Sequence, residues 1–164
     1  MRKKSAIGTV FVYAISAIII VLVFYFGYRG IAGFQKANQD SIAEKMQLRM
    51  KADMSELSMH YGSSGRFNYD AGSYFTKICF VDLNLNQISE GTRNSALENY
   101  PLILDSITES SSNNAFGTGE RFVAFDVGKL KVQCSPYFFC ANVTNGKVSF
   151  YAEGGGDSVV ILCK

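Results

Sequence analysis

The chain has 164 residues, with 16 Lys and Arg against 14 Asp and Glu and a single histidine. Four of the basic residues flank one apolar segment near the N-terminus, which leaves the remainder slightly acidic. A nucleic-acid-binding domain usually has a clear basic excess, so the composition argues against nucleic acid as a partner.

The apolar segment comprises residues 5–28 and contains no charged residue. As a helix it would be about 36 Å long, more than the ~30 Å hydrocarbon core of a bilayer. Arg2, Lys3 and Lys4 precede it and Arg29 follows it. Because basic residues stay on the cytoplasmic side, residues 1–4 form a short cytoplasmic leader and the C-terminal part faces outward. A cleavable secretory signal is the alternative, but its apolar core is usually only about 7–15 residues long.

The residues around the start of this segment form a recognisable run, Lys3-Lys4-Ser5-Ala6-Ile7-Gly8-Thr9-Val10. It resembles the leader junction of archaeal type IV pilins and archaellins, in which basic residues and a small residue precede an I-G-T-[VL] run. The resemblance covers about residues 2–28, and the early glutamate of many bacterial pilins is missing. It implies cleavage near Lys4, Ser5, Ala6 and Ile7 by a prepilin-type peptidase. It also implies that the apolar helix later leaves the lipid and packs among copies of itself in a filament.

Residues 29–60 predict a helical stem. The helix either continues through Gly27, Gly30 and Gly33 or starts again at Ser41–Glu44, an S-x-x-E capping box. Apolar residues then recur with helical spacing, and we expect this face to pack on the protein's own sheet: Ile42, Met46, Met50, Met54 and Leu57. The sequence of residues 61–65 predicts the end of the stem.

Residues 61–164 predict a β-rich extracytoplasmic domain. Strand-like patterns cover residues 74–83, 121–126, 129–134, 137–143, 147–152 and 157–163, and short turns between the later ones predict antiparallel pairing. Asn145-Gly146 is the strongest hairpin signal, with Val127-Gly128 and residues 154–156 as further turns. A short helix is expected from Pro101, with an apolar face of Leu102, Ile103 and Ile107, followed by a polar loop at residues 110–114. The predicted fold class is α+β: a transmembrane helix and an amphipathic stem packed on a C-terminal antiparallel sheet, as in pilins.

All four cysteines, Cys79, Cys134, Cys140 and Cys163, fall on the predicted outer side, where disulfides persist. Three pairings are open. A local Cys134–Cys140 bridge is plausible if the chain turns at Ser135-Pro136, and Cys79 would then pair with Cys163; four buried free thiols are the alternative. Asn142 begins the sequon Asn142-Val143-Thr144 and could be glycosylated on this topology.

Signals for catalysis are poor, and we expect no enzyme. The single histidine, His60, suits a surface or capping position, and the glycines at 117, 119 and 154–156 suit turns better than a phosphate cradle. No C-x-x-C pair or other zinc spacing occurs, so no metal site or cofactor is expected.

The leading hypothesis is a pilin-like structural or accessory subunit of a cell-surface filament, held in the membrane before assembly. Its partners would be the bilayer and other pilin-like subunits, with Gly8, Ser16 and Ala17 allowing close helix approach. A permanent single-pass anchor carrying a small extracellular binding domain is the alternative, and a membrane-tethered enzyme, thiol-dependent or otherwise, is a third hypothesis.

Overall fold

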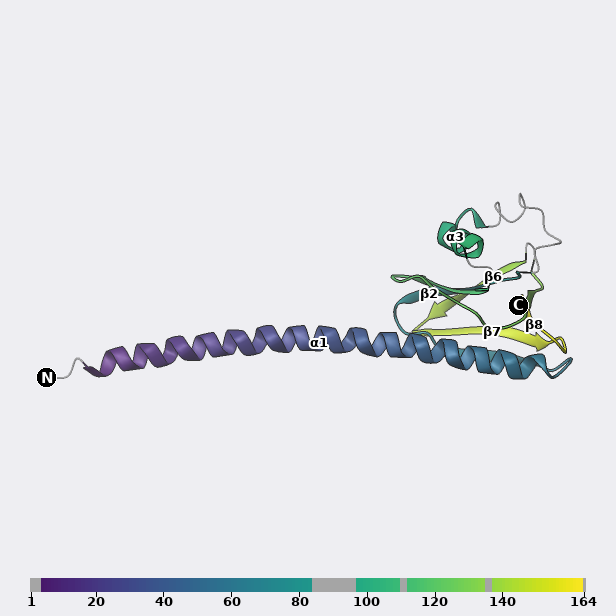
Figure 1. Cartoon of the computed structure of the whole chain (residues 1–164). Coiled ribbons are helices and arrows are strands. Elements are labelled where there is room, and N and C mark those ends of the chain that lie inside the picture. Colours follow the sequence, from purple (N-terminus) through teal and green to yellow (C-terminus); the bar gives the residue numbers. More distant parts are fainter. Residues whose placement is uncertain (1–3, 84–96, 110–111, 135–136, 164) are drawn as a thin grey trace. The chain divides into compact units, whose positions relative to one another are not determined.

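The computed structural model describes residues 4–83, 97–109, 112–134 and 137–163. The chain forms two compact units, residues 1–40 and residues 41–164, which are described separately. One helix, α1 (Lys4–Ser58), contributes to both, and a β-sheet with a short helix completes the second unit (Figure 1). The fold is α+β, with a long apolar N-terminal helix followed by a mainly antiparallel sheet, an arrangement compatible with pilin architecture.

Helix α1 is continuous, and this decides between the two expectations for the stem. Gly27, Gly30 and Gly33 lie inside the helix, and so does Ser41, which therefore does not cap a second one. Single glycines cost about 1 kcal/mol each in a helix, which good helix formers on both sides can offset. The helix ends at Ser58, slightly before the predicted stop, and Gly62 adopts a positive φ of 75° in the turn that follows.

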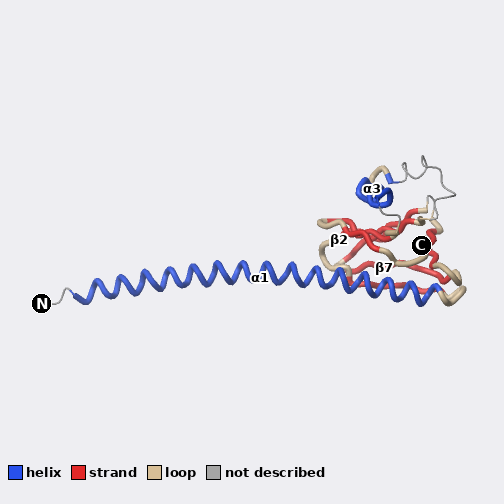
Figure 2. Tube along the Cα trace, viewed as in Figure 1, coloured by secondary structure: helices blue, strands red, loops and turns tan. Residues whose placement is uncertain are grey.

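Eight strands form the sheet of the second unit. Their bounds are β1 (Ser64–Asp70), β2 (Phe75–Val81), β3 (Ala115–Gly119), β4 (Val123–Phe125), β5 (Leu130–Val132), β6 (Phe138–Thr144), β7 (Lys147–Gly154) and β8 (Val159–Leu162). The order is β4-β3-β2-β6-β7-β8-β5, and β1 pairs along the other side of β7. Figure 2 shows the strands in red beside the C-terminal part of α1. Strand β6 meets β7 only beside their shared turn, at Val143–Val148 and Thr144–Lys147, and β8 takes over as the partner of β7 further along.

The turns were predicted with mixed success. Asn145 and Gly146 have φ of 53° and 73° and join β6 to β7 as an antiparallel hairpin, which confirms the type I′ signal. The glycines after β7 likewise join it to antiparallel β8. The expectation that all later strands pair antiparallel was wrong for β5, which pairs in parallel with β8. Short connections join β5 to β4 and to β6, but β5 pairs with neither of them. A short connection therefore did not produce a hairpin at β5.

Strand β3 was not expected, because Gly117-Thr118-Gly119 was interpreted as a turn. It pairs with both β2 and β4. An added Cβ at Gly117 would lie 2.6 Å from the buried Phe75 ring, so any larger residue here would force this ring to move.

The apolar residues form two clusters on different faces of the sheet. The larger joins the stem part of α1 to β1, β5, β7 and β8, with the Phe80 and Phe150 rings 4.7 Å apart. The smaller lies beneath helix α3 (Pro101–Glu109), where Ile103 and Ile107 pack with Cys79 and Phe116. Helix α3 begins at Pro101 as predicted, but Leu102 is exposed rather than part of the buried face.

Candidate membrane-spanning and assembly helix

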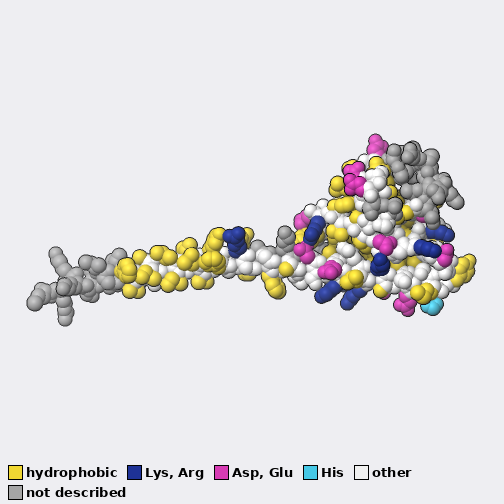
Figure 3. All heavy atoms as spheres, viewed as in Figure 1, with side chains coloured by type: hydrophobic (Ala, Val, Ile, Leu, Met, Phe, Trp, Pro, Cys, Tyr) yellow, Lys and Arg dark blue, Asp and Glu magenta, His cyan; other side chains and the backbone are white. Residues whose placement is uncertain are grey.

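The N-terminal part of α1 is apolar on every side. Every described side chain from Phe11 to Tyr28 is exposed, including Phe24 at 75% and Tyr28 at 80%. Hydrophobic side chains cover this segment in the space-filling view (Figure 3). By length and composition, α1 is the one helix among the described residues that is apolar enough to cross a membrane. A helix with no polar face needs an apolar environment on all sides, which lipid or other apolar helices can provide.

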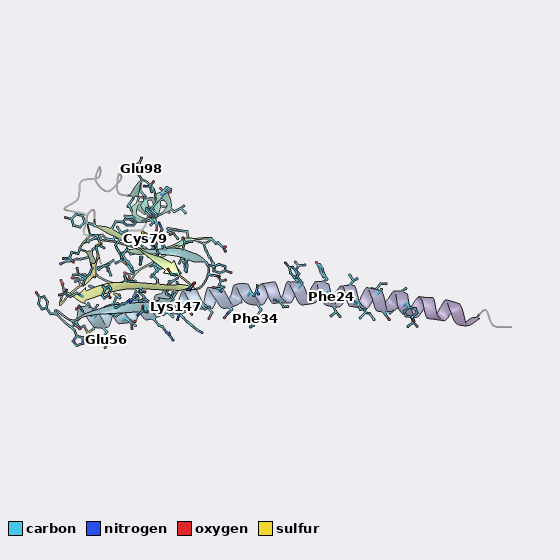
Figure 4. The ribbon with its side chains drawn as sticks, turned by 180° about the vertical axis from the view of Figure 1, so that it is seen from behind. Phe24, Phe34, Glu56, Cys79, Glu98 and Lys147 are labelled. Atoms are coloured by element: carbon cyan, nitrogen blue, oxygen red, sulfur yellow. A yellow bond between two sulfur atoms is a disulfide. The ribbon has the colours of Figure 1, made fainter. Side chains whose placement is uncertain are left out.

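The C-terminal end of this apolar segment carries aromatic rings and the first cation. Arg29 donates a hydrogen bond to the Tyr25 hydroxyl over 3.0 Å, one helical turn back. The Tyr25 and Phe26 rings meet edge to face at 5.5 Å. Rings with a polar end together with a basic side chain are typical of a membrane–water boundary. Figure 4 shows Phe24 and Phe34 projecting away from the helix axis.

The predicted processing positions lie at the start of α1. Lys4, Ser5, Ala6 and Ile7 are helical, whereas Arg2 and Lys3 fall outside the described residues. A peptidase that cuts here needs an extended backbone in its active site, so this first turn of helix would have to unwind before cleavage. Fraying of a terminal turn costs little, because its amides have no partners within the helix.

The stem differs from the apolar segment, because most of its apolar residues lie on one face and that face is buried. Met46, Met50, Met54 and Leu57 are all buried in the larger apolar cluster. This confirms that the stripe packs on the protein's own sheet. Ile42 is only half-buried, and the cluster takes up Ala43 instead.

Two polar contacts fix the stem to the sheet. The Tyr69 hydroxyl on β1 donates to Asp53 of the stem over 2.9 Å. Burial, this hydrogen bond and the negative charge of Asp53 all raise the pKa of Tyr69 well above its usual value. On the other side of the stem, Lys51 forms an ion pair of 2.9 Å with Asp126 at the end of β4.

The end of the stem lies directly against β7. A Cβ at Gly154 would lie 2.2 Å from the carbonyl oxygens of both Leu57 and His60. The Gly154 backbone also donates to Ser63 and accepts from Gly62, each over 2.8 Å. Only glycine permits this approach, so the triple glycine has a second use besides its turn.

Both disulfides are present, but the suggested local pairing was wrong. Cys79 bonds to Cys140, its direct partner across β2 and β6, with Cα atoms 3.9 Å apart. Cys134 bonds to Cys163, which connects the region after β5 to the region after β8. The parallel pairing of β5 and β8 brings these two strand ends together. The Ser135-Pro136 turn invoked for a Cys134–Cys140 bridge lies outside the described residues.

Asn114 is a structural residue that the sequence did not reveal. It belongs to the predicted polar loop, of which residues 110–111 lie outside the described part, yet it is buried. Its side chain accepts from Val127 over 3.0 Å and donates to the Gly128 carbonyl over 2.6 Å, and its backbone oxygen accepts from Val81. It holds the β4–β5 connection beside β2, a role that depends on contacts distant in sequence.

The remaining candidates are spread over the surface. Asn142 lies exposed near the end of β6, four positions before the hairpin glycine, and Thr144, the third residue of its sequon, is also exposed. His60 lies exposed in the turn after α1. Among the described residues, no three His, Cys, Asp or Glu side chains are placed to hold a metal ion. An open hollow beside β5 is lined by charged residues of both signs, Asp126, Lys129, Lys131 and Asp157, together with Ser112 and Ser158.

Comparison with known proteins adds no relative: no protein-family model, curated protein or solved structure matches the chain significantly.

Proposed function

We propose that this chain is a pilin-like structural or accessory subunit of a cell-surface filament, held in a membrane before assembly. The observation that carries the proposal is the division of one continuous helix into an all-apolar N-terminal part and a one-sided stem buried in a β-rich head. The leader-like run at Lys3–Val10 supports it independently.

The physical logic is that the apolar part can exchange one apolar environment for another. In a bilayer, lipid chains cover it; in a filament, the same part of neighbouring copies would cover it, and its backbone hydrogen bonds stay inside the helix in both cases. The head needs neither environment, because it has two clusters of its own and two disulfides. Such a subunit would have its N-terminus in the cytoplasm and its head outside the cell, or in an extracellular filament after assembly.

N-terminal sequencing of the protein from cell envelopes tests the proposal. The mature chain should begin within Lys4–Ile7, and the same fraction should contain fibres by electron microscopy. Replacing the small residue by Ala6→Arg should leave the leader in place and abolish fibres. Ala37→Arg, the same change beyond the apolar segment, is the control and should leave processing intact. Mature protein with residues 1–10 intact, and no fibres, would instead favour the permanent single-pass anchor.

A further inference from the structure

The segment of α1 between the apolar part and the stem is exposed on all sides. From Gly30 to Asn38 every described residue is exposed, and the Phe34 side chain is 77% exposed. Ala43 is the first described residue of α1 that is buried against the head. Lipid would cover the helix before Arg29, and the sheet covers one face of it from Ala43 onward. In between, the helix is held mainly by its own backbone hydrogen bonds.

Three glycines, Gly27, Gly30 and Gly33, weaken the helix where this segment begins. A Cβ added at any of them would meet no atom within 4 Å, so no contact within the described chain requires glycine there. In the head, by contrast, a Cβ at Gly117 or Gly154 would strike neighbouring groups. What the three helical glycines contribute is backbone freedom. Compared with alanine, each makes local opening of a helix about fivefold more frequent.

The position of the glycines relative to the membrane boundary decides which of them can open. Arg29, which bonds to Tyr25, marks that boundary, and Gly27 lies on its lipid side. An open backbone is costly in hydrocarbon, because nothing there satisfies its polar groups. Gly30 and Gly33 lie beyond the boundary, where water can satisfy them. We propose that Gly30 and Gly33 form a hinge at which α1 bends, so that the head turns relative to the membrane-held helix.

The hinge rests on the proposed function, which also gives it a use. In a bilayer, the lipid sets the direction of the apolar helix; in a filament, the neighbouring helices set it. A rigid helix would carry the head along with every change of this direction. A hinge outside both the apolar part and the head lets the two directions differ, while the packing of each part stays intact.

Amide hydrogen exchange of the full-length protein in lipid nanodiscs, one copy per disc, tests the hinge. Exchange of a helical amide follows the frequency of local opening, so the amides of residues 30–37 should exchange roughly tenfold faster than those of the buried stem. Gly30→Ala with Gly33→Ala should slow them about 25-fold. Ala37→Gly, the reverse change at an exposed position of the same segment, should speed them about fivefold. Exchange that responds to neither change would overturn the proposal.

The use of single copies excludes another explanation of the glycines. If they served only the close approach of neighbouring helices, the alanine variant would disturb assembly and leave exchange in single copies unchanged. That result would also overturn the hinge.

Distance distributions test whether opening bends the helix. Maleimide nitroxides on Phe24→Cys and Glu44→Cys would lie about 30 Å apart on a straight helix, since about 20 residues rise roughly 1.5 Å each. The wild-type segment should give a broad distribution, and Gly30→Ala with Gly33→Ala a narrow one near this value. The pair Glu44→Cys and Glu56→Cys, both within the stem, is the control and should give a narrow distribution in both backgrounds. An equally narrow Phe24–Glu44 distribution in both backgrounds would refute the bend.

Leader processing and fibre yield separate the hinge from the proposed function. The double alanine variant should keep a cleaved leader and give severalfold fewer fibres. Fibres at the wild-type level, despite slowed exchange, would overturn the hinge as an assembly device and leave the filament subunit standing. Hinge motion in a wild-type protein that keeps its leader and forms no fibres would support the hinge and favour the permanent anchor.

Discussion

The N-terminal and C-terminal parts of α1 are equally helical, and they differ in how apolar residues are distributed around the axis. From Phe11 to Tyr28 the apolar side chains point in all directions and stay exposed, whereas from Ser41 to Ser58 most of them line one buried face, and the charged side chains lie elsewhere. Helicity therefore does not distinguish the all-apolar part from the stem. The angular distribution of apolar side chains decides which part packs on its own domain and which part needs lipid or other subunits.

The largest expected effect comes from placing charges in the apolar part. Ile19→Asp with Leu22→Asp should raise the free energy of membrane insertion by about 5–7 kcal/mol, since each buried carboxylate costs roughly 2.5–3.5 kcal/mol. Most of the protein should then leave the membrane fraction, as measured by carbonate extraction and immunoblotting. The urea midpoint of the head should not change, and an unfolded head would contradict the independence of the two parts.

The second largest effect is expected from removing the disulfides of the head. They close loops with sequence separations of 61 and 29 residues. Loop-closure entropy predicts that replacing either pair by alanine costs about 4 kcal/mol, slightly more for Cys79–Cys140. Urea unfolding of the two double variants measures this. A larger loss for the Cys134–Cys163 pair would show that strain or packing, rather than loop length, sets the order.

A matched pair of substitutions sharpens the comparison within the stem itself. Met50→Ala should destabilise the head by about 2–5 kcal/mol, because Met50 is fully buried against the sheet. Leu48→Ala, two residues away on the exposed side of the stem, should change the unfolding free energy by no more than about 0.5 kcal/mol. Similar losses for both variants in urea would mean that Leu48 is not exposed in the protein.

The local features of the fold could be predicted from the sequence, because they depend on periodicity and on turn residues. They are the long helix, its buried methionine face, the Asn145-Gly146 hairpin and the start of a helix at Pro101. The disulfide pairing, the parallel β5–β8 contact and strand β3 could not, since they depend on which distant segments become neighbours. The roles of Asn114 and Gly154 could not be predicted for the same reason. Asn114 is a polar loop residue that bonds to Val127 and Gly128. Gly154 is a turn glycine that lies against the backbone of Leu57 and His60.

The Tyr69–Asp53 contact gives a smaller effect with a defined pH range. Tyr69→Phe removes the hydrogen bond and should cost about 1 kcal/mol at neutral pH. Because the folded-state pKa of Tyr69 is raised, its contribution is fully present below the unfolded value near 10 and is lost as the pH rises above it. Wild-type stability should therefore fall more steeply than that of Tyr69→Phe above about pH 10 in urea titrations. Parallel curves would indicate that the phenol ionises as freely in the folded head as in the unfolded chain.

The smallest effect concerns Asp126, which pairs with Lys51 on the exposed side of the stem. Partial burial alone would raise the pKa of Asp126, but the hydrogen bonds from Lys51 and the Gly128 amide, with the charge of Lys51, lower it below its usual value. A lowered pKa contributes stability above the unfolded value near 3.9, and this is lost as the pH falls below it. Because solvent screens the exposed pair, Asp126→Asn should cost only about 0.2–0.5 kcal/mol at pH 7, and the cost should shrink as the pH falls below the unfolded value. Urea unfolding over this acidic range and at pH 7 measures the difference, and a loss at pH 7 comparable to that of Met50→Ala would mean that the ion pair, rather than the buried methionine face, holds the stem to the sheet.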